Sequence, residues 1–236
     1  MHVRSHLGHA QSHLAIQATH MSYERMPFVH RTPGAAEILY VMAAPLEYGP
    51  HLKSRITPLM TGIGPVEAAI VVTEALCQLK AANKMPAIVV SLGSAGSARL
   101  EQLGVYQATS VSYRDMDASA LGFEPGVTPL LDLPATLELG PFVPRIPKAT
   151  LSSGANVVSG AAYDRVGTDM VDMETYAVLR VCQRFTLPLI ALRGISDGDE
   201  ELSHLDDWQQ YLHIVDEKLA HAVDLLEAAI SQGTLE

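Results

Sequence analysis

A nearly continuous apolar run at residues 87–92 constrains the fold of this chain more than any other feature. Such a run is typical of a central parallel strand that is covered on both faces. It leads directly into the small residues 93–97, where a ligand could approach the backbone. Parallel strands need crossover connections, usually helices, so the rest of the chain should alternate strands and helices.

The remaining segments follow this alternation. Strands are predicted at residues 37–44, 56–60, 104–112, 149–153 and 187–195. Helices are predicted at residues 65–82, 172–184 and 206–231. Residues 122–147 are rich in Pro and Leu without periodicity, so we expect irregular structure with short strands there. Together these segments predict an α/β fold, with three α/β/α layers around a central mixed, mainly parallel sheet.

Two of the predicted helices carry apolar residues at helical spacing. In the helix at 65–82, one face holds Val66, Ile70, Thr73 and Cys77. In the last helix the apolar residues predict a face that packs on the sheet: Trp208, Leu212, Val215, Leu219, Val223, Leu226 and Ile230.

The cysteines indicate the redox setting. Cys77 and Cys182 lie in apolar helical segments and lack the spacing of a metal site or a disulfide. We therefore expect both in the core of a reduced, cytoplasmic protein.

Composition and charge narrow the class of partner. The chain has 236 residues, of which 48% are hydrophobic and 18% charged, so it can build one substantial core. Its apolar runs are shorter than a membrane span, so we expect no membrane partner. The formal net charge of -10 argues against nucleic acid, because binding phosphates requires clustered Lys and Arg. A small molecule is the expected partner.

The start of the chain differs from the rest. It is polar and carries histidines at no spacing that suits a metal or one helix face: His2, His6, His9, His13, His20 and His30. A metal tether is one interpretation, and a weakly packed leader or tail without a signal peptide is the favoured one. We expect a tail or extension at residues 1–36 and a single catalytic domain at residues 37–236.

Polar residues follow several of the predicted strands. They are Glu47, Ser94, Asn156 and Asp197. Ligand sites in parallel α/β folds lie beyond the carboxyl ends of the strands, so these residues could converge on one crevice. A further acid, Glu174, lies at the start of a predicted helix.

Two of these acids suit cleavage of the carbon–nitrogen bond between a sugar and a purine. The leaving base must accept a proton while the sugar gains oxocarbenium character. Asp197 follows an apolar strand, so partial desolvation would raise its pKa and suit a proton donor, which Ser196 could orient. Glu174 beside the polarisable Met173 suits ribose hydroxyls above a soft apolar wall.

The same reaction requires a water held against the anomeric carbon. Glu47 is the remaining acid that could orient it, with Arg193 and Ser94 as helpers. Each residue also has a structural alternative. Glu174 could complement a helix dipole, Asp197 could cap a loop, Arg193 could pair with an acid, and Glu47 could be a solvated loop residue.

Several stretches stand in a specific order along the chain. They are Ala43-Ala44-Pro45-Leu46-Glu47, Thr61-Gly62-Ile63-Gly64-Pro65-Val66-Glu67-Ala68-Ala69, Leu92-Gly93-Ser94-Ala95-Gly96, Val171-Asp172-Met173-Glu174, Arg193-Gly194-Ile195-Ser196-Asp197 and Ser203-His204-Leu205. With these stretches the chain resembles the purine nucleoside phosphorylase superfamily, and most closely the 5′-methylthioadenosine/S-adenosylhomocysteine nucleosidases. The resemblance extends from about Ile38 to the end.

The resemblance implies hydrolysis of the N-glycosidic bond without a cofactor, and it implies roles for individual residues. Asp197 would be the general acid near the purine N7, Glu47 would act as base toward the water, and Glu174 and Met173 would hold the ribose. The other implied site residues read the base or place the water: Ser196, Asn156, Val157, Val158, Ser94 and Arg193. It also implies a homodimer whose partner subunit closes the pocket over the 5′ substituent.

The chain departs from the family at the base-reading loop. Where the nucleosidases commonly carry Gly-Asp-Ala-Phe-Ile, it reads Gly154-Ala155-Asn156-Val157-Val158, with an aliphatic residue at the place of the stacking ring.

The nucleophile separates a hydrolase from a phosphorylase. Residues 43–52 and 87–98 contain no Lys or Arg that could hold phosphate, so hydrolysis is favoured. The alternatives are a phosphorolytic enzyme, a hydrolase of adenosine or futalosine, and a nucleoside sensor without turnover.

Overall fold

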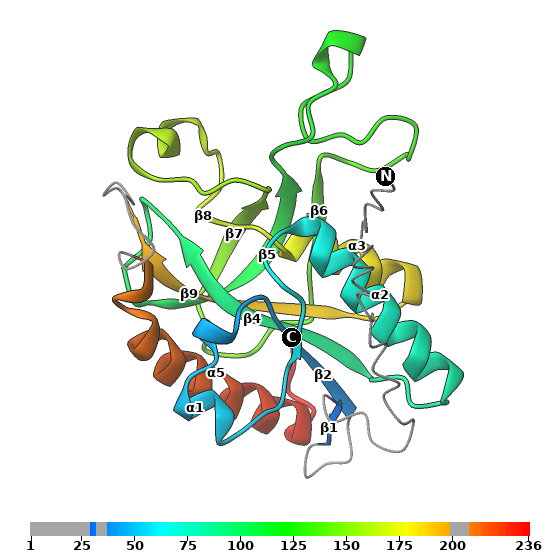
Figure 1. Ribbon diagram of the computed structural model, residues 1–236, viewed down its shortest axis with the longest axis vertical. Coiled ribbons are helices and arrows are strands. Elements are labelled where there is room, and N and C mark those ends of the chain that lie inside the picture. The colour runs from blue at the N-terminus through cyan, green and yellow to red at the C-terminus, as the bar shows by residue number, and fades with distance from the viewer. Residues whose placement is uncertain (1–28, 32–36, 199–207) are drawn as a thin grey trace, which may run out of the picture.

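The computed structural model describes residues 29–31, 37–198 and 208–236, in which helices surround one sheet (Figure 1). The sheet of the described residues has nine strands. They are β1 (Val29–Arg31), β2 (Glu37–Met42), β3 (Leu59–Met60), β4 (Ile88–Gly96), β5 (Val105–Tyr113), β6 (Thr136–Glu138), β7 (Lys148–Ser153), β8 (Met170–Asp172) and β9 (Leu189–Asp197). The α-helices described are α1 (Pro50–Lys53), α2 (Pro65–Ala81), α3 (Thr175–Phe185) and α5 (Leu212–Gln232).

The sheet is mixed, as predicted. Parallel pairs join β2 to β3 and β4, β4 to β9, and β7 to β5 and β8. Antiparallel pairs join β1 to β2, β4 to β8, β5 to β6, and β5 to β9. Strand β9 makes both kinds of pair, because it is parallel to β4 and antiparallel to β5.

The period-two alternation of the strands divides the core into two clusters. Leu39 and Val41 of β2 belong to a cluster that includes buried residues of α2 and α3. Ile38 and Tyr40 of the same strand belong to a second cluster, which includes residues of α1 and α5. Helices therefore cover both faces of the sheet, as Figure 1 shows.

Val66, Ile70, Thr73 and Cys77 share one face of α2, as predicted, but the prediction that Cys77 lies in the core is wrong, because this face is exposed. Val66 and Ile70 are 65% and 55% exposed, and Cys77 is exposed as well. The face that packs on the core is instead made of Ala68, Val72, Ala75, Leu76 and Leu79. The helix is apolar on two sides, and the side that carries Leu76 and Leu79 packs in the same core cluster as residues of α3. Cys182 is buried, as predicted.

Several predicted boundaries move by a few residues. The helix expected from residue 172 begins at Thr175, because residues 170–172 pair with β7 and β4 as strand β8. The strand expected at 56–60 is reduced to Leu59–Met60. The long last helix is described as α5 from Leu212, while residues 206–207 lie outside the described residues.

Other predictions also fall outside the described residues: Ser203-His204-Leu205 and the histidines from His2 to His20. Within the described ranges, no helix combines the length and the apolar character needed to cross a membrane.

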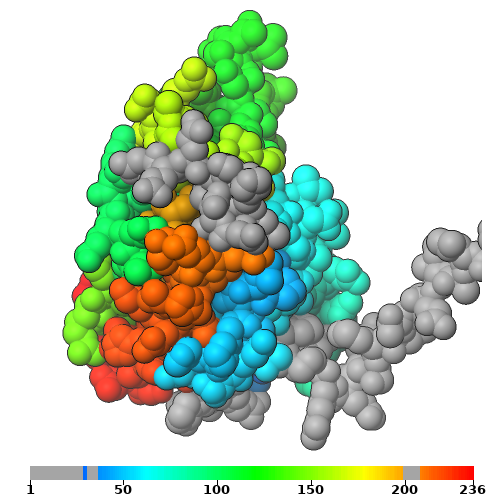
Figure 2. Space-filling model, turned by 60° about the vertical axis from the view of Figure 1, so that its left-hand side comes forward, coloured from blue at the N-terminus to red at the C-terminus, as the bar shows by residue number. Residues whose placement is uncertain are grey.

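A buried carboxylate fastens the first loop to the last helix. Asp216 of α5 is 1% exposed. Its oxygens accept hydrogen bonds from the backbone N–H groups of Gly49, His51 and Leu52 at 2.9–3.1 Å. These are donors at the start of α1 that a helix cannot satisfy by itself. The loop therefore packs directly on α5, as the contact between the blue and orange segments in Figure 2 shows.

We predict that Asp216→Asn lowers the free energy of unfolding by about 2–4 kcal/mol. The asparagine side chain keeps one acceptor oxygen, but its NH2 group then faces backbone N–H groups that have lost their acceptor. Urea unfolding checks this value. The matched control is Asp224→Asn on the same helix, which removes an exposed pair with Arg55 and should cost less than about 1 kcal/mol. Equal losses in both variants would contradict a special role for Asp216.

Candidate active site

A cavity of about 520 Å³ opens beyond the carboxyl ends of β2, β4, β7, β8 and β9. Its lining residues come from segments that are far apart in the sequence: Ala43, Ala44, Glu47, Ile63, Ser94, Ala95, Gly96, Arg114, Asn156, Val157, Val158, Val171, Asp172, Met173, Glu174, Asp197 and Trp208. The structure thus brings together Glu47, Ser94, Asn156 and Asp197, the residues that follow predicted strands.

Glu47 is a buried carboxylate with one occupied and one open oxygen. It ends a short 3-10 helix, Pro45–Glu47, and is 5% exposed. Its Oε1 accepts hydrogen bonds from the Ser94 backbone N–H at 2.6 Å and the Ser94 hydroxyl at 2.7 Å. Among the described residues, none donates to the buried Oε2. Burial raises the pKa of Glu47, against the lowering effect of Ser94.

Trp208 is a site residue that the sequence pattern assigned to the sheet-packing face of a helix. Its indole lines the cavity, and its Nε1–H donates to the Ser94 Oγ at 3.0 Å. Because its spacing matches the apolar stripe of α5, periodicity could not separate it from core residues. Trp208 supplies the only ring among the described residues that line the cavity.

Asp197 ends β9 and receives two hydroxyl groups. Ser196 donates to Oδ1 at 2.6 Å, and the Tyr163 hydroxyl donates to Oδ2 at 3.5 Å. Burial raises the pKa of Asp197, against the lowering effect of the hydrogen bonds from Ser196 and Tyr163. Ser196 itself is buried behind Asp197 and outside the cavity lining. Tyr163 was not singled out in the sequence.

Glu174 stands immediately before α3, with Met173 beside it in the cavity wall. Its Oε1 accepts a hydrogen bond from the backbone N–H of Gly64 at 2.7 Å, rather than from its own helix. Gly64 has a φ of 101°, a conformation that favours glycine. Burial, and then the nearby Asp172, raise the pKa of Glu174 to about 7.

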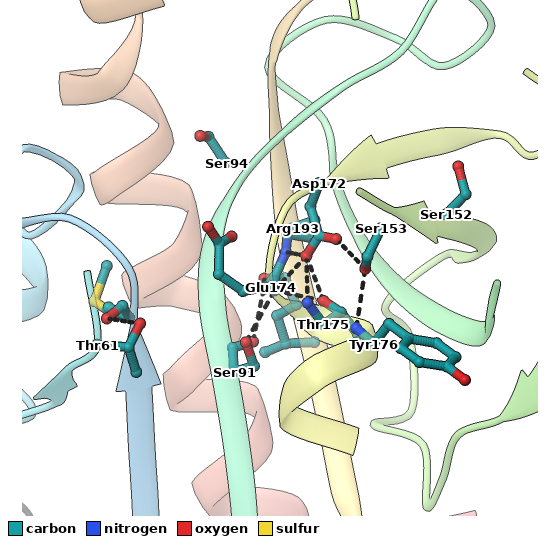
Figure 3. A network of polar contacts seen from close by, with 12 residues as sticks. Thr61, Ser91, Ser94, Ser152, Ser153, Asp172, Glu174, Thr175, Tyr176 and Arg193 are labelled. Atoms are coloured by element: carbon teal, nitrogen blue, oxygen red, sulfur yellow. Dashed lines mark hydrogen bonds and ion pairs between the residues drawn. The ribbon is translucent and has the colours of Figure 1, made fainter. Parts of the chain in front are cut away.

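Arg193 lies behind the cavity wall and outside its lining. It is 2% exposed, and its guanidinium donates to Asp172 Oδ2 at 2.9 Å and to Thr175 Oγ1 at 2.6 Å (Figure 3). The guanidinium also donates to the hydroxyl oxygen and to the carbonyl oxygen of Ser91. This geometry matches the structural alternative, in which Arg193 pairs with an acid. The partner, Asp172, had no assigned role in the sequence.

Arg114 organises the loop that contains Asn156, Val157 and Val158. A guanidinium has five N–H donors, and all five of Arg114 are engaged. They reach the carbonyl oxygens of Ser152, Gly154, Asn156 and Asp172 and the side-chain oxygen of Asn156. Val157 is 66% exposed in this loop and lines the cavity. The guanidinium of Arg114 therefore holds this loop in place, and none of its N–H groups is left to bind a ligand.

A larger groove of about 880 Å³ runs over α2 and α3. Its lining side chains are mainly apolar and include no Asp or Glu. The acids predicted for the site, Glu47, Glu174 and Asp197, line the smaller cavity instead. Within the described residues, no three His, Cys, Asp or Glu side chains gather as metal ligands would.

Comparison with known proteins identifies the relatives of this chain. A family model described as the phosphorylase superfamily matches residues 151–230. A 5′-methylthioadenosine/S-adenosylhomocysteine nucleosidase of Glaesserella parasuis serovar 5 is 31% identical over 188 residues, covering 71% of this chain and 78% of the relative. A nucleosidase of the same name from Exiguobacterium sp. is 28% identical over 191 residues, covering 72% and 79%.

Solved structures share the fold. The nucleosidase from Neisseria meningitidis in complex with methylthio-immucillin-A has a TM-score of 0.66 at 17% identity, over 81% of this chain and 98% of that one. Futalosine hydrolase of Helicobacter pylori strain 26695 has a TM-score of 0.67 at 20% identity, over 80% and 96%. Because a relative is 31% identical over 71% of this chain, the chain belongs to the 5′-methylthioadenosine/S-adenosylhomocysteine nucleosidase family.

Proposed function

We propose that this chain hydrolyses the N-glycosidic bond of 5′-methylthioadenosine and S-adenosylhomocysteine, and releases adenine and the 5′-thioribose product. The observation that carries the proposal is the carboxylate of Glu47, whose open Oε2 lies buried at a cavity that also holds Asp197 and Glu174. The names of the relatives support these two substrates.

On the base side, Asp197 acts as the general acid. Burial raises the pKa of this carboxyl, which suits a proton donor, and the hydroxyls of Ser196 and Tyr163 hold it in place. As the bond between the sugar and the purine breaks, its electron pair moves to the base, and the proton of Asp197 passes to N7. Asn156, Val157 and the neighbouring backbone surround the base from the loop that Arg114 holds.

On the sugar side, Glu47 acts as the base toward water. The water oxygen bonds to the anomeric carbon, which has gained oxocarbenium character, and its proton goes to Glu47. Glu174 binds the ribose hydroxyls above the soft wall of Met173. Ser94 acts on the water through Glu47, and Arg193 acts by holding Asp172 beside Met173.

The charge around the cavity favours water over phosphate. Phosphorolysis needs free cationic donors for a phosphate dianion. Of the described lining residues, Arg114 alone is cationic, and all of its donors are bonded within the protein. A buried carboxylate such as Glu47 would repel phosphate.

We predict that the purified protein releases adenine from 5′-methylthioadenosine in phosphate-free buffer at a rate that added phosphate does not raise. Chromatography of adenine and of the sugar product checks this, with adenosine and futalosine as comparison substrates. Release that depends on phosphate, with a sugar 1-phosphate as product, would establish phosphorolysis instead. Binding of the nucleoside without release would identify a sensor.

We predict that Asp197→Asn lowers kcat by about 10²–10⁴-fold and leaves nucleoside binding largely intact, because the amide keeps the shape but cannot donate the proton. Steady-state kinetics and equilibrium dialysis measure the two quantities. The control is Asp224→Asn, an exposed acid of α5 far from the cavity lining, which should keep wild-type turnover. Turnover near wild type in Asp197→Asn contradicts the assigned role.

We also propose a homodimer that forms over the groove of α2 and α3. The exposed apolar residues Val66 and Ile70 line this groove. Ile63, just before α2, is 56% exposed and lines the catalytic cavity, so the groove approaches the cavity mouth. A partner subunit on this surface would cover apolar area and close the cavity over the 5′ substituent.

We predict that Ile70→Glu shifts the protein from dimer to monomer, because it places a charge in an apolar interface. Light scattering coupled to size-exclusion chromatography measures the mass. The control His213→Glu alters an exposed position on α5, on the opposite face of the sheet, and should leave the dimer intact. A monomeric wild type, or a dimeric Ile70→Glu protein, would overturn this assignment.

We infer, in addition, that residues 37–236 form one catalytic domain with three layers, preceded by an extension at residues 1–36 whose strand β1 pairs with the edge of the sheet at β2. The two core clusters on opposite faces of the sheet support the layers. The net charge of -10 supports a protein that binds no nucleic acid, and the unpaired cysteines support a cytoplasmic location. Limited proteolysis that cuts first within residues 37–198 would contradict the division.

A further inference from the structure

We propose that Trp208 is a positioning residue for the hydrolytic water: its indole N–H fixes the Ser94 hydroxyl so that this hydroxyl donates to Glu47. The proposal rests on the hydrolysis proposed above. It depends on a chain of two hydrogen bonds, from Trp208 Nε1 to Ser94 Oγ at 3.0 Å and from Ser94 Oγ to Glu47 Oε1 at 2.7 Å.

The direction of this chain follows from the donors available. An indole nitrogen can only donate, so the Ser94 oxygen must accept from Trp208. The hydroxyl has a single hydrogen, which is then directed to Glu47. The Ser94 backbone N–H donates to the same oxygen at 2.6 Å, so Oε1 receives two donors from one residue.

This saturation decides which oxygen of Glu47 meets the water. Oε1 is occupied by Ser94, whereas Oε2 is buried and receives no donor from the described residues. A water that enters the cavity and donates to Glu47 is thereby directed to Oε2. Without the indole N–H, the Ser94 hydroxyl could rotate and offer its hydrogen to the water oxygen, which would weaken the water as a nucleophile.

Trp208 is well placed for this role. It lies 114 positions from Ser94 along the chain and reaches the cavity from just before α5. Its side chain is partly buried, so the hydrogen bond to Ser94 is sheltered from bulk solvent. Figure 3 labels Ser94 but draws no dashed line between it and the residues around Arg193. The hydroxyl of Ser94 instead contacts the indole of Trp208 and the carboxylate of Glu47.

A double-mutant cycle tests the proposal. The variants are Trp208→Phe, which keeps a ring and removes the N–H, Ser94→Ala, which removes the hydroxyl, and the combination of both. Loss of one orienting hydrogen bond should lower kcat of Trp208→Phe by about threefold to tenfold, with KM within about twofold. In the Ser94→Ala background, Trp208→Phe should lower kcat no further, because the hydroxyl it orients is absent.

The outcomes are distinct. If the kcat losses of Trp208→Phe and Ser94→Ala multiply in the double variant, or if Trp208→Phe changes only KM, then Trp208 acts through packing and the proposal is overturned. Trp208→Leu, which removes both the ring and the N–H, separates the two contributions and should be slower than Trp208→Phe. A wild-type protein that releases no adenine would overturn hydrolysis itself, and this inference with it.

Fluorescence gives a second test that needs no turnover. The chain contains one tryptophan, so its emission reports Trp208 alone. Titration of Asp197→Asn with 5′-methylthioadenosine should change the emission along a saturating curve, because the indole lines the cavity. Unchanged emission at a ligand concentration where dialysis shows full occupancy would mean that Trp208 is remote from the bound nucleoside, and would overturn the proposal.

Discussion

The buried ion pair between Arg193 and Asp172 is the interaction on which the site depends. Both side chains are nearly inaccessible, 2% and 1% exposed, and their charged atoms lie 2.9 Å apart. Desolvating both charges is costly, and the pair is sustained by further bonds to Ser91, Thr175 and Ser153. These bonds connect β4, β7, β8, β9 and the start of α3. Met173 and Glu174 follow Asp172 directly, so the pair sets their position.

Burial also gives the cavity its acid–base character. The pKa values of Glu47, Glu174 and Asp197 are all raised, chiefly because burial disfavours their ionised forms. What differs is the set of donors. Glu47 receives two donors on one oxygen, Glu174 receives a backbone N–H, and Asp197 receives two hydroxyls. These environments suit a base, a sugar-binding group and a proton donor respectively.

A departure from the family pattern lies at the base-reading loop. An aliphatic residue, Val157, stands where the family commonly has a ring, and the loop is held by the fully engaged guanidinium of Arg114. On the other side, an indole contacts the Ser94–Glu47 pair. The cavity thus combines the acids Glu47, Glu174 and Asp197 with an aliphatic side chain at the loop and an indole beside Ser94.

The sequence by itself determined the strand–helix order and the acids of the site. Apolar runs marked β2, β4, β5, β7 and β9 to within a few residues, and the strand ends predicted that Glu47, Ser94, Asn156 and Asp197 meet, because local pattern and the geometry of sheets are sufficient for both. The tertiary structure decided which face of α2 is buried, that β9 pairs antiparallel with β5, and which groups each charged side chain contacts. It placed Arg193 in the interior, outside the cavity lining, and placed the Trp208 indole against Ser94. Those outcomes depend on contacts between residues far apart in the chain, which periodicity does not encode.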